Sequence, residues 1–265
     1  MPWRALTRRN EVPGPMNILV TFAVQAEFAP WQRRRSFRRL PGEWPVFETE
    51  FGDAHVRVIL TGMGQSHALQ AVRTVLPSRP DICISTGLAG ALRTGYRPGD
   101  ILAARLVSEV GEPVAVASHR ELLSTAVDCG ARQAERFATS RTLVARSEHK
   151  RQLGSQAEAV EMESYTILAE AARYGVPSVA IRAISDTVDF DMPYDFERAC
   201  DARGRVRVGS ILMQALRRPS GVPNLLTLAR DSRVAARQLA NFLDAYTSSI
   251  ADRLVPIESN MVAVQ

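Results

Sequence analysis

ESYTILAEAARYGVPSVAIRAISD, residues 163–186, contains the pattern that decides the fold. Its first half predicts a helix over 163–174, which ends at Gly175 and Pro177 because both residues disfavour a further helical turn. The apolar run 178–184 that follows predicts a strand of a buried sheet. A helix that leads directly into a buried strand is the repeating unit of an α/β protein.

Similar units lie N-terminal to this stretch. The segment 17–23, NILVTFA, predicts a buried strand, and 46–51 and 55–61 predict a hairpin around Gly52 and Asp53. Apolar residues at helical spacing predict a helix from 65 to about 76. Further strands are predicted at 81–86, where Gly87 ends the strand, and at 101–107. We therefore expect an α/β fold with a mostly parallel or mixed central sheet flanked by helices.

The segment 108–156 has a weaker pattern, whereas the C-terminal part is clearly helical. We predict a helix at 122–127, a short strand at 142–145, and helix from residue 206 onward. One stripe near the C-terminus has alternating spacings of three and four, which is typical of an amphipathic helix packed on a core. Its members are Leu225, Leu228, Ser232, Ala235, Leu239, Phe242 and Tyr246.

Length and composition indicate an ordinary globular protein. Of 265 residues, 46% are hydrophobic and 23% charged, so the core needs no staples. The three cysteines are widely spaced with no CxxC pair, and we expect no disulfide framework, metal or cofactor. We expect a flexible leader over 1–15, one domain over 16–250 and a tail over 251–265. Neither a secretory signal nor an apolar run of about 20 residues is found, so the expected location is the cytoplasm.

The net charge of +5 is concentrated in two arginine clusters, at 33–39 and 203–218. Basic clusters attract phosphate groups of nucleic acids or anionic lipids, but a plain solvated surface is the simpler explanation and the one we favour. Aromatic residues do not alternate with these arginines, so no nucleic-acid partner is expected.

Carboxylates and glycines follow several predicted strands, where ligands bind in parallel sheets. The carboxylates are Glu27, Glu163 and Asp186, and the glycines lie in the segments 61–66 and 86–91. Each has a structural explanation by itself: a first-turn carboxylate for Glu27, an N-cap for Asp186, a solvated side chain for Glu163, and tight turns for the glycines.

Together these residues suit the cleavage of a bond between a base and a ribose. The reaction passes through an oxocarbenium-like sugar, so that one acid must protonate the leaving group while a base activates the nucleophile on the opposite face. Glycines let backbone amides approach the substrate closely.

Four segments resemble the nucleoside phosphorylase superfamily: TGLAGAL (86–92), RPGDIL (97–102), AVEMES (159–164) and GVPSVAIRAISD (175–186). The branch they resemble most is that of methylthioadenosine/S-adenosylhomocysteine nucleosidases, whose substrates are adenine nucleosides. This resemblance implies that Glu27 activates water and that Asp186 protonates the purine at N7. It also implies that Met162 packs on the ribose and that Glu163 binds its hydroxyls. Ala89, Gly90 and Ser185 would line the same pocket.

There are two departures from that branch. Leu88 replaces a serine of the glycine turn, and 142–156, TLVARSEHKRQLGSQ, lacks the aromatic residue that stacks on adenine. The segments 150–153 and 191–231 are instead similar to hopanoid-associated phosphorylases, which act on adenosylhopane, a lipid-linked nucleoside. A lipidic substrate would give the arginine clusters a role at an anionic membrane.

Three functions therefore stay open at this level. Hydrolysis requires Glu27 as base, and we favour it slightly. Phosphorolysis requires donors for phosphate, for which Gly64, Ser66 and Arg93 are the candidates. A non-catalytic nucleoside- or lipid-binding protein would not need all three carboxylates. The resemblance also implies a homo-oligomer.

Overall fold

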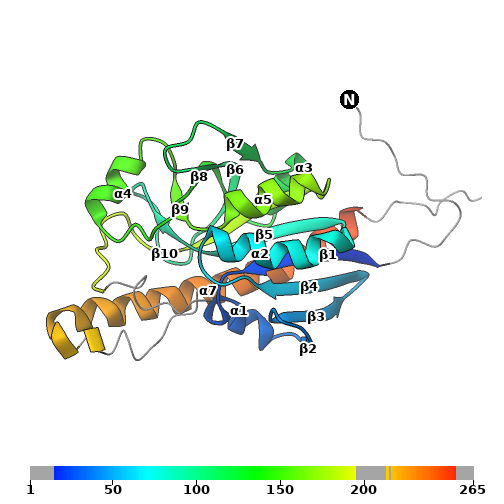
Figure 1. The fold of residues 1–265 in the computed structure, drawn as a ribbon, viewed down its shortest axis with the longest axis horizontal. Coiled ribbons are helices and arrows are strands. Elements are labelled where there is room, and N and C mark those ends of the chain that lie inside the picture. Colours follow the sequence, from blue (N-terminus) through cyan, green and yellow to red (C-terminus); the bar gives the residue numbers. More distant parts are fainter. Residues whose placement is uncertain (1–14, 195–212, 215, 255–265) are drawn as a thin grey trace, which may run out of the picture.

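The computed structural model describes residues 15–194, 213, 214 and 216–254 (Figure 1). Its strands are β1 (Met16–Phe22), β2 (Arg38–Leu40), β3 (Val46–Phe51), β4 (Ala54–Leu60), β5 (Ile82–Ala91), β6 (Ile101–Glu109), β7 (Ala115–Ala117), β8 (Arg132–Thr139), β9 (Ala159–Glu161) and β10 (Ser178–Asp186). Its helices are α1 (Gln25–Gln32), α2 (Gln65–Val75), α3 (Arg120–Asp128), α4 (Ser147–Leu153), α5 (Ser164–Arg173) and α7 (Val222–Leu254), with 3-10 turns η1 (Leu76–Ser78) and η2 (Pro219–Gly221). The predicted leader except Pro15, and the predicted tail from residue 255 onward, lie outside the described residues.

The strands form one mixed sheet in the order β10-β6-β8-β9-β5-β1-β4-β3-β2, with β7 paired to β6. Because β5 also pairs with β10, the five strands β10, β6, β8, β9 and β5 close on themselves. The strands β1, β4, β5 and β10 run parallel to one another and bring their carboxyl ends to one edge. The expected α/β fold is therefore confirmed, with the sheet mixed rather than mostly parallel.

Helices cover both faces of the sheet. Alternate residues of β1 show this directly: Ile18 and Val20 belong to the core that includes α1 and α7, whereas Leu19 belongs to the core that includes α2 and α5. Figure 1 shows α1 beside α7 and α2 beside α5. Both faces of β1 are thus removed from water, as its continuous apolar sequence predicts.

The predicted stripe of α7 is buried at its C-terminal end. Ala235, Leu239 and Tyr246 are fully buried and Phe242 is nearly so, while Arg233 and Arg237 are exposed. The prediction of an amphipathic helix is confirmed for this region. The N-terminal part of the predicted helical region, 206–212, lies outside the described residues. No helix within the described ranges is long and apolar enough to cross a bilayer.

Two predictions about strands are wrong, one about where a strand ends and one about whether a strand forms. The strand predicted to stop at Gly87 continues to Ala91, because Gly87 adopts φ +147° and the chain goes on pairing with β10. The strand predicted at 142–145 is absent. That segment instead follows β8, and the carbonyl of Ala145 accepts a 2.9 Å hydrogen bond from the amide of Met192. Residues 86–91 therefore belong to a strand and do not form a turn between strand and helix.

Candidate active site

Glu27 lies in the first turn of α1, directly after β1. Its Oε2 accepts hydrogen bonds from the backbone amides of Ala23 (3.0 Å) and Val24 (3.3 Å), which caps its own helix. Its Oε1 accepts a 3.0 Å hydrogen bond from the amide of Leu88, far away in sequence on β5. Burial raises the pKa of Glu27, against the lowering effect of the Leu88 amide and of the charge on Arg182. The carboxylate is thus fixed at the edge of the sheet and suited to accept a proton.

Gly87 makes this position of Glu27 available. A Cβ at residue 87 would lie 3.1 Å from both carboxylate oxygens of Glu27, and φ +147° disfavours any other residue. Glycine is therefore required at residue 87 because a carboxylate lies close to the backbone there. The group that approaches is the side chain of Glu27 and not a substrate.

The segment 161–163 places two glutamates with different environments. Glu161 accepts hydrogen bonds from the amides of Glu163 (3.0 Å) and Ser164 (2.7 Å) and from the guanidinium of Arg182 (2.5 Å). Burial would raise its pKa, but Arg182 and these donors outweigh burial and lower it. Glu161 therefore stays anionic, holds the start of α5 and balances the buried charge of Arg182.

Glu163 is 7% exposed and faces a less favourable field. Burial and the neighbouring negative charge of Glu161 raise its pKa to about 8, although Arg182 and the amide of Gly64 oppose the shift. That amide donates a 2.7 Å hydrogen bond to Oε1, and Arg182 lies 3.8 Å from Oε2. Glu163 therefore holds a proton more readily than an ordinary glutamate, and it lies between the amide of Gly64, which follows β4, and Arg182 on β10.

Asp186 ends β10 and is 3% exposed. Its Oδ1 accepts a 2.6 Å hydrogen bond from the hydroxyl of Ser185, which also lies 3.2 Å from the carbonyl of Ala89. Its Oδ2 accepts a hydrogen bond from the ammonium of Lys150 on α4. A Cβ at Gly90 would lie 3.0 Å from that same Oδ2, so the small residue leaves room for the carboxylate. The structure thus brings Ser185, Ala89 and Gly90 around Asp186.

Lys150 and Arg182 are the polar residues that sequence reasoning missed. Lys150 lies among charged residues, which predicts exposure, and Arg182 is the single arginine of an apolar run. Their side chains are nevertheless 0% and 1% exposed, respectively. A charged residue inside the buried strand 178–184 was a usable signal, because a buried charge requires partners. The local pattern predicts the same exposure for Lys150 as for its exposed neighbours Glu148 and His149, so its one available signal was that the sequence contains no other lysine.

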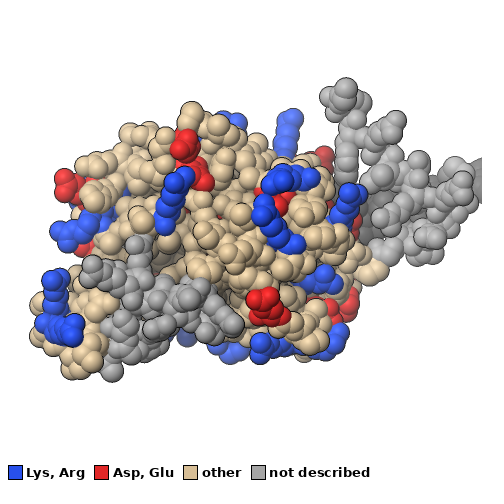
Figure 2. Space-filling model, in the orientation of Figure 1, with Lys and Arg blue, Asp and Glu red and all other residues tan. Residues whose placement is uncertain are grey.

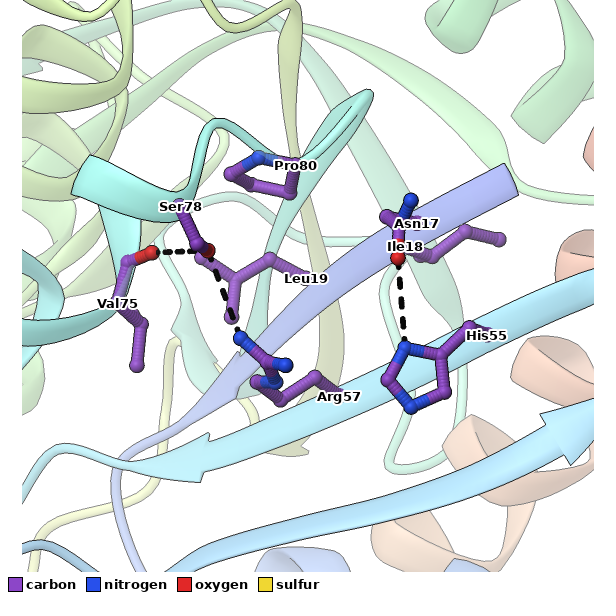
Figure 3. A pocket seen from close by; sticks show the side chains of 8 residues that line it. All are labelled: Asn17, Ile18, Leu19, His55, Arg57, Val75, Ser78 and Pro80. Atoms are coloured by element: carbon purple, nitrogen blue, oxygen red, sulfur yellow. Dashed lines mark hydrogen bonds between the residues drawn. The ribbon is translucent and has the colours of Figure 1, made fainter. Parts of the chain in front are cut away.

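A small cavity of about 40 Å³ lies beside Asp186 and Glu161, and neither Glu27 nor Glu163 is among its described lining residues. Gly90, Met162 and Asp186 line it together with the apolar side chains of Leu143, Val144 and Met192. Among its described lining residues there is no aromatic ring. The larger cavity, of about 120 Å³, lies at the opposite edge of the sheet beside Asn17, His55 and Arg57 (Figure 3) and holds none of the predicted site residues.

The residues proposed for phosphate are engaged elsewhere or exposed. The Gly64 amide donates to Glu163, and Arg93 binds the carbonyl of Gly154 (2.7 Å) and the carboxylate of Glu158 (2.6 Å). Ser66 is exposed on α2. Among the residues that the structure describes, no group of three His, Cys, Asp or Glu side chains could hold a metal ion.

The family model described as "Phosphorylase superfamily" matches residues 17–217. A methylthioadenosine/S-adenosylhomocysteine nucleosidase of Actinobacillus succinogenes is 28% identical over 180 residues, which is 59% of this chain and 78% of that protein.

Solved structures agree in fold at low identity. A Helicobacter pylori nucleosidase of the same name, in complex with a substituted pyrrolidin-3-ol, aligns with a TM-score of 0.70 and 17% identity over 89% of this chain and 99% of its own. A futalosine hydrolase mutant of the same organism aligns with a TM-score of 0.69 and 16% identity over 88% of this chain and 99% of its own. The Neisseria meningitidis nucleosidase in complex with methylthio-immucillin-A aligns with a TM-score of 0.67 and 19% identity over 88% of this chain and 99% of its own.

Proposed function

Because the chain belongs to the phosphorylase superfamily, we propose that it hydrolyses the N-glycosidic bond of a purine nucleoside, with adenine as the expected base. The observation that supports the proposal is that Glu27, Glu163 and Asp186 are all buried or partly buried beside the carboxyl ends of β1, β4, β5 and β10. Each of the three is held by a different group: Leu88, Gly64 and Lys150 respectively. A non-catalytic binding protein would not require three carboxylates with such separate environments.

The geometry suggests a role for each residue. Glu27, with a raised pKa and fixed orientation, takes the proton of the attacking water. Glu163 binds the ribose hydroxyls while Met162 packs against the sugar. Asp186, at the cavity that Gly90 and Met162 share, protonates the base at N7. Acid and base then act from opposite ends of the bond that breaks.

Water is favoured over phosphate as the nucleophile. Phosphate requires free cationic or amide donors, whereas Arg93 is paired with Glu158 and the amide of Gly64 with Glu163. The decisive experiment is to incubate the protein with methylthioadenosine, S-adenosylhomocysteine, adenosine and inosine, with and without phosphate, and to measure free base. Release that is independent of phosphate supports hydrolysis, and release that requires phosphate supports the phosphorylase alternative.

A lipid-linked nucleoside such as adenosylhopane is the alternative substrate, and it would require contact with an anionic membrane. The first arginine cluster lies over α1 and β2, where Figure 2 shows basic side chains along one edge. Arg35 lies 3.0 Å and Arg34 3.6 Å from Asp244, and Arg38 pairs with Glu48, which lowers the net charge available there. Arg203, Arg205 and Arg207 of the second cluster lie outside the described residues. The soluble substrates therefore come first in the assay, and the expected homo-oligomer is to be tested by light scattering.

A further inference from the structure

Lys150 is the only lysine in the chain. Of its 33 lysine and arginine residues, all the others are arginine. This one lysine is also completely buried, although lysine is among the residues least often found inside proteins. A chain that uses arginine at every other cationic position keeps lysine at the position that touches Asp186.

Lysine differs from arginine in two properties that matter at such a position. Its ammonium is a compact charge with three donors, whereas the guanidinium is a planar fork with five. Lysine can also release a proton, while arginine remains charged at all pH values reached in proteins.

The surroundings of Lys150 match the three donors of an ammonium. Its Nζ donates to Oδ2 of Asp186, to the carbonyl of Thr187 (3.1 Å) and to the carbonyl of Phe190 (2.9 Å). Each N–H therefore has an acceptor, and two of the acceptors are fixed backbone groups. The ammonium is held in one place against the carboxylate of Asp186.

Other charged groups near this pair are already paired or exposed. On the loop after β10, Asp189 binds Arg151 at 2.6 Å and Asp191 accepts the amide of Ser147 at 2.6 Å. From the strands, Glu161 binds Arg182 and Glu158 binds Arg93. On α4 itself, Glu148 and His149 are exposed. Among the described residues, Asp186 is the carboxylate that pairs with Lys150.

We propose that Lys150 is a positioning residue that supplies, through Asp186, the proton that the departing base receives. The proposal rests on the proposed function. Both oxygens of Asp186 accept hydrogen bonds, from Ser185 and from Lys150, which is the arrangement of an anion. An anionic Asp186 has no proton of its own to give, whereas the ammonium that touches it has one.

The proton count closes over one turnover. As the glycosidic C–N bond breaks, its electron pair passes to the base. One proton moves from the ammonium of Lys150 to Asp186 and from Asp186 to N7, which leaves Asp186 anionic again and Lys150 as a neutral amine. The attacking water forms the new C–O bond and gives its proton to Glu27. Solvent then takes that proton from Glu27 and returns one to Lys150. One nucleoside and one water become one base and one ribose.

The test compares Lys150→Met with Arg151→Met, a matched control that removes the neighbouring cation on α4, which pairs with Asp189 outside the site. We expect kcat of Lys150→Met at neutral pH to fall by about 10²-fold. The deficit relative to wild type should shrink as the pH is lowered, because solvent then supplies the proton that Lys150 no longer gives, while protonation of Glu27 affects both proteins alike. Arg151→Met should keep the kcat and the pH profile of the wild type.

A second measurement does not depend on turnover. Protein labelled with ¹⁵N at lysine Nζ should give one side-chain signal, and in Asp186→Asn that signal should shift because the ammonium loses its counter-ion. The signal should also be observable in wild type at neutral pH, since a buried ammonium with three acceptors exchanges slowly with water.

Specific outcomes overturn the inference. A loss of kcat in Lys150→Met that is equal at every pH shows a structural role only, and an Nζ signal unchanged by Asp186→Asn shows that the pair does not form. In both cases an active wild type leaves the proposed function standing. A wild type that releases no base from any nucleoside overturns the proposed function and this inference together.

Discussion

The backbone amide of Leu88 donates a 3.0 Å hydrogen bond to Oε1 of Glu27, across 61 positions of sequence. This bond connects the first turn of α1 to the part of β5 that continues past Gly87. It fixes the orientation of the carboxylate independently of any substrate. The base that we propose is therefore positioned before the nucleoside binds, which is the condition for efficient proton transfer.

Gly87→Ala should displace that carboxylate. The new Cβ would lie 3.1 Å from both oxygens of Glu27, and the backbone would be strained at φ +147°. We expect a loss of about 1–3 kcal/mol in the free energy of unfolding and about 10²-fold in kcat. Gly130→Ala is the control, because φ is +100° there and nothing lies within 4 Å. If the two variants lose the same kcat, the role assigned to Gly87 is wrong.

Glu27→Gln should remove the base while leaving its size. Glutamine cannot take the proton of water, so kcat should fall by about 10²–10⁴-fold with little change in KM. The measurement is the release of free base from the best nucleoside of the panel, at several phosphate concentrations. Activity of the variant close to that of wild type would exclude Glu27 as the base.

Asp186→Asn should lose both activity and stability. Base release should fall by about 10²–10⁴-fold because amide nitrogen is a poor acid. The free energy of unfolding should fall by about 3–5 kcal/mol, since Lys150 would remain buried without its counter-ion. Asp189→Asn serves as control: its pair with Arg151 is exposed and should contribute less than about 1 kcal/mol. Denaturant unfolding of both variants checks the comparison.

Glu163 should make stability depend on pH in an unusual direction. Its pKa is about 8 in the folded protein against 4.5 for an ordinary glutamate. Between these values the folded state binds more protons than the unfolded state, so this residue's contribution is fully present below pH 4.5 and is lost as the pH rises to about 8.

Glu163→Gln should remove that dependence. We expect the free energy of unfolding to fall less steeply between pH 4.5 and about 8 in the variant than in the wild type. Chemical denaturation at a series of pH values measures the slope. Parallel curves for the two proteins would show that Glu163 is ionised throughout this range.

Local sequence determined the alternation of elements and three of the site's carboxylates. The apolar run 178–184 could only be a buried segment, and it forms β10; the spacing of Leu239, Phe242 and Tyr246 placed one face of α7 on the core. Glu27 and Asp186 were found because they follow strands, and the carboxyl ends of parallel strands lie at one edge. These features depend on residues close in sequence, whose periodicity is visible without a fold.

Only the tertiary structure decided the surroundings of those carboxylates. Lys150 sits among exposed charged residues of α4, and its burial against Asp186 depends on how α4 packs beside the end of β10. Gly87 does not end its strand, because the pairing with β10 continues past it. Burial and contacts between charges determine which glutamate is anionic and which holds a proton more readily. Both depend on segments that the fold brings together from distant parts of the chain, so local sequence does not reveal them.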